Sequence, residues 1–175
     1  MDWEEDVETL LSEIADEAAL RAKLHSRQHT SYKGCNQCFH IPVVVLSVLS
    51  GSASFISESY TDLTRKYMVM GIGAVSIFVS IVSAVGSYLK LAELSESNHI
   101  ASLQWSKLYS KIKFCLYLQR EHRAPCHEFT HNIFTEHERL NEISPVLLDK
   151  HVTKVRSKLK KRALDNGFVL PFNFN

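Results

Sequence analysis

The sequence predicts an all-α integral membrane protein built around a two-helix transmembrane hairpin. Two long runs, Gly34–Ser57 and Tyr67–Leu89, contain none of the 20 basic and 19 acidic residues of the chain. A helix needs roughly 20 such residues to cross about 30 Å of hydrocarbon. The link between the runs, Glu58–Lys66, carries four charges and suits water or a headgroup surface. We therefore expect transmembrane spans at about 39–57 and 67–89.

The second run is the more uniform of the two, and it has tyrosines at both ends, Tyr67 and Tyr88. Tyrosine is enriched at the two interfaces of a bilayer, so both positions suit anchoring there. The first run begins with polar residues, which leaves Phe39–Ile56 as its apolar part. A buried hairpin in a soluble helical protein is the alternative, but a soluble helix of this length normally keeps one charged face. Neither run supplies such a face.

The distribution of basic residues predicts the topology. The link contains Arg65 and Lys66, and the other 18 basic residues lie in the two flanks. The positive-inside tendency therefore places both termini in the cytosol. The chain opens with MDWEEDVE, which is acidic where a signal peptide is basic, so we expect the first span to act as an internal signal anchor.

Four segments follow from this topology. They are an N-terminal amphipathic cytosolic helix at 1–33, the transmembrane hairpin at 34–89, a cytosolic helical region at 90–163 and a C-terminal tail at 164–175. The first segment is expected to be helical from Asp2 to about Gln28, with acidic residues in its first turns, where they suit the helix dipole.

The second span is expected to continue into the cytosol as one long helix, because neither Pro nor Gly occurs between Lys90 and Gln119. Pro125 then breaks the helix, and Ser144-Pro145 predicts the start of a last helix that is basic on most of its surface. The apolar face expected for the long helix consists of Leu91, Leu94, Ile100, Leu103, Leu108, Ile112, Cys115 and Leu118. A second stripe consists of Phe129, Ile133, His137, Leu140 and Ile143.

Small residues form a stripe along the second span, at steps of three and four. In lipid such residues let helices approach closely and exchange hydrogen bonds. The stripe favours packing of the two helices of one hairpin, and the alternative is the lining of a pore formed by several chains. The predicted interface or pore-lining residues are Gly73, Ser76, Ser80, Ser83 and Gly86 on the second span, with Ser47 and Gly51 on the first.

Two cysteines, Cys35 and Cys38, have the spacing of half a zinc site or of a dithiol pair. Cys126, His127 and His131 are candidates for further ligands, but no second pair of thiols follows, so we expect no metal and no cofactor. The sequence also lacks the short motifs of hydrolases, metalloproteases and nucleotide-binding enzymes, so we expect a protein that is not an enzyme. A basic group near the C-terminus is expected to contact lipid headgroups or a partner. It consists of Lys154, Arg156, Lys158, Lys160, Lys161 and Arg162.

The arrangement resembles the SLATT-type two-transmembrane proteins. The resemblance covers about residues 20–150. It includes His40-Ile41-Pro42 at the entry to the first span, Gly51-Ser52 at its centre, and LAELSESNHIASLQWSKLYSKI after the second. It implies that Glu96 and His99 form the polar pair of the family. Leu140 and Pro145 match its closing motif. Members of this family are membrane effectors that oligomerise and perforate the membrane, and stand-alone copies occur in large DNA viruses.

We therefore expect a membrane protein that self-associates, as an oligomeric pore-forming or membrane-perturbing effector. The alternative is a structural membrane protein of a virion, which anchors a capsid layer to an internal membrane. A soluble helical protein with a zinc or redox role for its paired cysteines is the third hypothesis. The expected partners are the lipid bilayer, further copies of the chain and capsid or other membrane-associated proteins. No specific nucleic acid is expected, because the net charge is only +1.

Overall fold

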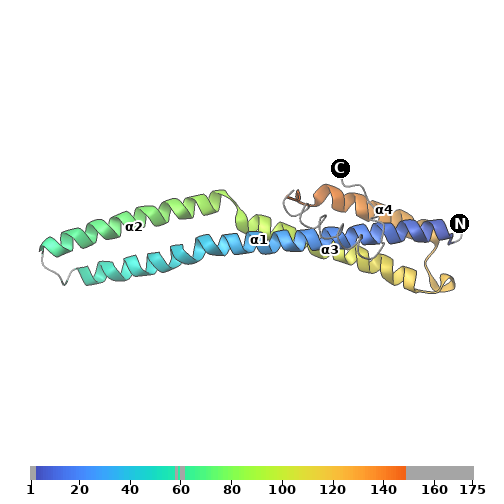
Figure 1. Ribbon diagram of the computed structural model, residues 1–175, viewed down its shortest axis with the longest axis horizontal. Helices are drawn as coiled ribbons and strands as arrows, with labels where there is room; N and C mark the ends of the chain where they lie inside the picture. Colours follow the sequence, from blue (N-terminus) through green and yellow to red (C-terminus); the bar gives the residue numbers. More distant parts are fainter. Residues whose placement is uncertain (1–2, 58, 60–61, 149–175) are drawn as a thin grey trace, which may run out of the picture. The chain divides into compact units, whose positions relative to one another are not determined.

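The computed structural model describes residues 3–57, 59 and 62–148, and within these ranges every regular element is a helix (Figure 1). The elements are α1 (Glu5–Ser57), α2 (Asp62–Tyr88), α3 (Leu91–Tyr117), the short 3₁₀-helix η1 (Arg120–His122) and α4 (Cys126–Ile143). This confirms the predicted all-α class. The described residues divide into two compact units: a hairpin, Ser31–Leu94, and a bundle made by the residues up to Thr30 and from Ser95 onward.

The hairpin packs α1 against α2 in antiparallel orientation (Figure 1). Ser50 Oγ lies 3.4 Å from Ser76 Oγ, and a Cβ atom at Gly86 would lie 3.9 Å from Cβ of Phe39. Partly or fully buried residues recur along both helices at coiled-coil-like steps. This seam consists of Phe39, Val43, Leu46, Ser50 and Ala53 on α1, with Met68, Ile72, Val79, Ser83 and Gly86 on α2.

Helix α1 is longer than the sequence predicted. The expected N-terminal helix and the expected first span form one helix of 53 residues, with Pro42 inside it. Proline has no amide hydrogen, so the carbonyl of Cys38 lacks its usual donor four residues on. The first turn contains Glu5, Asp6 and Glu8, which complement the positive end of the helix dipole.

The second span does not continue as one helix, and this prediction was wrong. Helix α2 begins at Asp62, inside the predicted link, and ends at Tyr88, and α3 begins at Leu91. Lys90, between them, has a φ of 46°, in the left-handed region. The Lys90 amide donates to the carbonyl of Ser87 (3.2 Å), which closes the last turn of α2. Helices commonly end at a residue with positive φ, but that residue is usually glycine, so lysine gives no sequence signal for this ending.

The bundle is formed by the first part of α1 together with α3 and α4. Ion pairs and hydrogen bonds set the directions: Lys113 pairs with Asp16 and Arg120 with Glu8, so α3 runs antiparallel to α1. Phe129 contacts Trp3 and His137 pairs with Glu17, so α4 runs parallel to α1. The largest fully buried apolar side chains are Trp105, Leu11, Leu24, Leu108, Ile112, Ile133 and Leu140.

The buried face of α3 differs from the predicted one. Leu94, Ile100 and Leu103 are 38%, 47% and 50% exposed, whereas Ala101 and Trp105 are buried. The prediction assumed that the long aliphatic side chains are buried. In the structure, the buried stripe of Leu108, Ile112 and Cys115 continues at the same helical spacing through Trp105 and Ala101 toward the N-terminus of α3.

Ion pairs around Glu8 join the start of α1 to the chain that follows α3. Glu8 accepts hydrogen bonds from Arg120 (2.8 Å) and Arg123 (2.6 Å), and the Arg120 and Arg123 guanidinium groups hold the pKa of this carboxyl below its usual value. Arg123 also lies over the Trp3 ring and donates to the carbonyls of Leu116 and Leu118. This arginine therefore satisfies the last carbonyls of α3 and ties them to α1.

Replacing Lys90 with glycine is expected to raise the free energy of unfolding. The left-handed conformation costs an L-residue roughly 1 kcal/mol, and glycine removes most of that cost. The exposed ion pair between Lys90 and Glu93 is lost in this variant, but such pairs contribute little. Unfolding by urea of the detergent-solubilised chain measures the change.

Lys107→Gly is the matched control, because Lys107 is exposed in the middle of α3. A glycine in a helix interior costs about 1 kcal/mol, so this variant is expected to lose stability. Equal losses in the two variants would contradict a left-handed Lys90.

Candidate functional site

Two helices of the described chain are long and apolar enough to cross a membrane. One apolar stretch lies in the later part of α1 and the other in α2, and neither is buried inside the described structure. Large side chains on both helices point away from the seam and are more than half exposed. They include Val44, Val48, Leu49 and Phe55 on α1, and Met70, Ile77, Phe78 and Ile81 on α2.

The predicted small residues fall into two groups. Ser76, Ser83 and Gly86 lie at the seam between α1 and α2 or beside it, as intrahairpin packing requires. Ser47, Gly51, Gly73 and Ser80 lie outside the seam and are exposed, and nothing lies within 4 Å of a Cβ built on either glycine. Packing inside one hairpin therefore accounts for only part of the stripe.

The exposed hydroxyl groups are satisfied by their own helices. Ser47 donates to the carbonyl of Val43 and Ser80 to that of Ser76, both at 2.8 Å. A hydroxyl that bonds four residues back leaves no unpaired donor. These faces can therefore contact lipid or another helix without leaving a hydroxyl hydrogen unpaired.

A buried layer of polar side chains joins α1 to α3 in the bundle. His25 and Asn98 are buried, and the Nδ1 of His25 donates to Asn98 Oδ1 at 3.0 Å. One turn further along α1, the Nδ1 of His29 donates to the carbonyl of Ser95 (2.9 Å), and Ser95 Oγ donates to the carbonyl of His29 (3.3 Å). Satisfied contacts of this kind fix the register of two helices, because any slip leaves buried donors unpaired.

Gln28 extends this layer to the chain that follows α4. Its Nε2 donates to the carbonyl of Val146 and its Oε1 accepts from the amide of Leu148, both at 3.1 Å. The side chain is almost fully buried. One amide group thus holds this segment by two backbone hydrogen bonds. Residues 145–148 are not helical, so the prediction that a last helix starts at Ser144-Pro145 was wrong.

Glu96 and His99, the polar pair implied by the family resemblance, are both exposed on α3. The ring of His99 lies against that of His29, with centroids 4.8 Å apart and planes tilted by 33°. Glu96 is exposed, and no ion pair between Glu96 and His99 is present in the described part of the chain. His99 therefore contacts the edge of the polar layer through His29, while remaining exposed itself.

Burial is the main cause of the altered acidity of His25. It lowers the pKa of this imidazole, and the positive charge of Arg21 lowers it further, while the hydrogen bond to Asn98 acts in the opposite direction. The pKa of His25 is therefore below its ordinary value of about 6.5. We infer that His25 is neutral at pH 7 and that its proton is on Nδ1.

A second polar group lies between α1, α3 and α4. Glu17 pairs with His137 (3.3 Å) and with Arg21 (2.6 Å). The neighbouring His137 imidazole is the main reason that the pKa of Glu17 is lowered, although burial opposes it. Arg21 also lies over the Trp105 ring at 4.9 Å, and the Trp105 indole donates to Ser144. These contacts connect all three helices of the bundle.

The cysteines do not form a metal centre with other described residues. No group of three or more His, Cys, Asp or Glu side chains that could hold a metal ion occurs in the ranges 3–57 and 62–148. Cys35 and Cys38 are free and exposed on α1, whereas Cys126, one of the sequence candidates for a further ligand, is buried in the bundle.

The predicted basic contact residues lie outside the described residues, as does the apolar C-terminal tail. The first of these basic residues is Lys154 and the last is Arg162. Their expected contacts with headgroups remain predictions.

Sequence reasoning missed the buried polar layer. Its signal was present: the apolar stripe of Leu11, Ile14 and Ala18 continues at the same helical spacing into His25 and Gln28. Polar side chains at core positions of a stripe indicate a buried hydrogen-bonded layer.

No protein-family model, curated protein or solved structure matches this chain. The residues described above therefore carry the functional argument.

Acidification is expected to destabilise the wild-type bundle through His25. Because its folded pKa is lowered, its contribution is fully present above pH 6.5 and is lost as the pH falls below that value, by up to about 1.4 kcal/mol per pH unit. His25→Gln keeps a donor but does not titrate, so its loss of stability between pH 7.5 and 5.5 should be smaller. Thermal unfolding of both proteins at the two pH values makes the comparison.

His127→Gln is the control, because His127 is exposed on α4. It should retain the wild-type pH dependence. A His25→Gln chain that also retained it would show that His25 is not the titrating group.

Asn98→Ala is expected to cost about 1–3 kcal/mol, because it leaves the buried Nδ1–H of His25 without an acceptor. Urea unfolding at pH 7.5 measures this loss. Asn132→Ala, at an exposed position on α4, should change stability by less than about 0.5 kcal/mol. A loss at Asn98 as small as that at Asn132 would mean that the layer does not stabilise the bundle.

Proposed function

We propose that this chain is an integral membrane protein whose hairpin crosses the bilayer with both termini in the cytosol. One observation carries the proposal: the bulky apolar side chains of α1 and α2 face outward instead of being buried. In water, a continuous apolar surface of this extent promotes aggregation, whereas hydrocarbon covers it without cost. The charge of the flanking segments supports the orientation, because 18 of the 20 basic residues lie outside the link.

The proposed activity is that of an oligomeric pore-forming or membrane-perturbing effector. The seam brings Ser50 Oγ to within 3.4 Å of Ser76 Oγ, which leaves no room for water between the two helices of one chain. A pore therefore requires several chains. Membership of the SLATT-type family is part of this proposal.

The small residues outside the seam provide the contacts for association. Gly51 and Gly73 offer bare backbone to a neighbouring helix, which allows close approach in lipid. Ser47 and Ser80 add weakly polar positions to the same two helices. In the proposed oligomer, glycines pack between chains and hydroxyl groups face the lumen. Basic residues from Lys154 to Arg162 contact headgroups on the cytosolic side.

The mass of the detergent-extracted complex tests the proposal. Light scattering, with the contribution of the detergent subtracted, is expected to give one discrete oligomer, and the same preparation should conduct ions across planar bilayers. A chain that is monomeric and electrically silent would overturn the effector proposal. A monomer or dimer that co-purifies with capsid would instead favour the anchoring role.

Gly73→Leu is expected to reduce the oligomer and the conductance by tenfold or more, because a bulky side chain at the contact separates the chains. A Cβ atom at Gly73 has nothing within 4 Å inside the hairpin, and the position is exposed, so the fold should be retained. Val69→Leu is the matched control, because Val69 is exposed on the same helix and already bears a branched side chain. Equal oligomer fractions in the two variants would exclude Gly73 from the interface.

A further inference from the structure

The four cysteines of the chain occupy two different environments. Cys115 and Cys126 are buried in the bundle, and burial raises the pKa of Cys115. Cys35 and Cys38 are free and exposed on α1, immediately before the apolar part of the first span. The exposed thiols can be reached by a reagent or an enzyme, whereas the buried ones cannot.

The two exposed thiols begin a stripe that runs down the outer side of α1. From Cys38 the stripe continues at helical steps through Pro42, Val45, Leu49 and Ile56. The last three of these side chains are more than half exposed, because the seam with α2 lies on another side of the helix. From Cys38 to Ile56 the stripe is roughly 27 Å long, close to the thickness of the hydrocarbon layer.

Their neighbours place the thiols at the membrane surface. Lys33, two residues before Cys35, is exposed and basic, and Phe39 and Ile41 follow one and three residues after Cys38. If the hairpin spans the bilayer as proposed above, the thiols lie at the cytosolic headgroup level. An acyl chain attached there would continue into hydrocarbon along the exposed stripe.

We propose that Cys35 and Cys38 are S-acylation sites that carry long-chain fatty acyl groups. The inference rests on the proposed membrane insertion. The donor is a long-chain acyl-coenzyme A, and a membrane-bound acyltransferase catalyses the transfer. The cysteine Sγ forms a bond to the acyl carbonyl carbon, the thioester bond to coenzyme A breaks, and the thiol proton passes to the sulfur of the leaving coenzyme A. No group is oxidised or reduced.

Acylation accounts for the pair better than metal binding does. A metal would need further ligands, and no third His, Cys, Asp or Glu side chain completes a set around these cysteines within the described residues. Acylation needs only an accessible thiol at a membrane surface, and cysteines beside a transmembrane helix are its usual substrates. Two acyl chains would also strengthen the anchoring of α1 at this interface.

Acyl exchange on the full chain in eukaryotic cells tests the inference. Free thiols are blocked with N-ethylmaleimide, thioesters are cleaved with hydroxylamine, and the released thiols are labelled with maleimide-polyethylene glycol. The wild type is expected to shift by two increments, Cys35→Ser and Cys38→Ser by one each, and the double variant by none. The double variant retains Cys115 and Cys126, so it also shows whether the buried thiols contribute.

Carbonate extraction of the same samples separates the two proposals. A wild-type chain that stays in the membrane pellet but shows no hydroxylamine-dependent shift overturns acylation and leaves membrane insertion standing. A shift that persists in the double variant overturns the assignment to Cys35 and Cys38. A wild-type chain that carbonate releases in soluble form overturns membrane insertion and, with it, the acylation that depends on it.

Discussion

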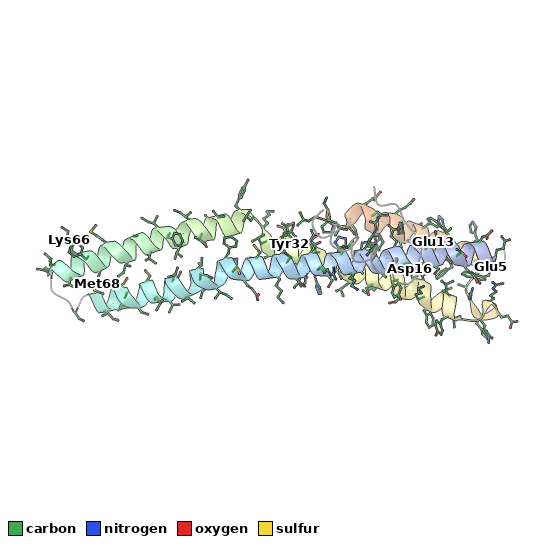
Figure 2. All side chains as sticks on the ribbon, in the orientation of Figure 1. Glu5, Glu13, Asp16, Tyr32, Lys66 and Met68 are labelled. Carbon is green, nitrogen blue, oxygen red and sulfur yellow. The ribbon has the colours of Figure 1, made fainter. Side chains whose placement is uncertain are left out.

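The structure depends on α1, whose first part buries its apolar side chains in the bundle and whose later part exposes them. The first part of α1 follows the rule for water, with Leu11, Ile14 and Ala18 inside and acidic residues such as Glu5, Glu13 and Asp16 along it, outside the core (Figure 2). The later part instead exposes bulky apolar side chains, and its seam combines Phe39, Val43 and Leu46 with Ser50 and Ala53. Because both parts belong to one continuous helix, the change from an apolar inside to an apolar outside is built into a single element.

The buried polar layer lies where the residues of the bundle come closest in sequence to the hairpin, at 25–29 of α1 and 95–99 of α3. Here polar side chains occupy the core positions in place of apolar ones. His25, Gln28 and Asn98 form hydrogen bonds with one another or with the backbone. Apolar side chains alone tolerate small slips between helices, whereas directional hydrogen bonds do not. The layer therefore sets the register of α1 against α3, and through Gln28 it also holds the chain that follows α4.

The outer surface of the hairpin connects the functional proposals. A two-helix seam encloses no lumen, so perforation of a membrane by this chain requires association. The seam leaves Gly51 and Gly73 uncovered, and these are the positions at which a second hairpin can approach most closely. The exposed cysteines lie on α1 before the apolar part of the first span, so acylation would act on the interface between the helix and the headgroups and not on the small residues.

The sequence by itself determined the helical class, the two uncharged runs and most of the core stripe of α4, where Phe129, Ile133, His137 and Leu140 face inward as expected but Ile143 is 52% exposed. Each of these is a local property. The hydrophobicity of a run and the periodicity of a stripe depend only on residues that are close in sequence. Only the tertiary structure decided that α1 continues through Pro42, that Lys90 ends α2, and that Trp105 is buried in place of Leu103. The buried face of a helix is chosen by its partners, and those of Trp105 and Asn98 lie tens of residues away in the chain.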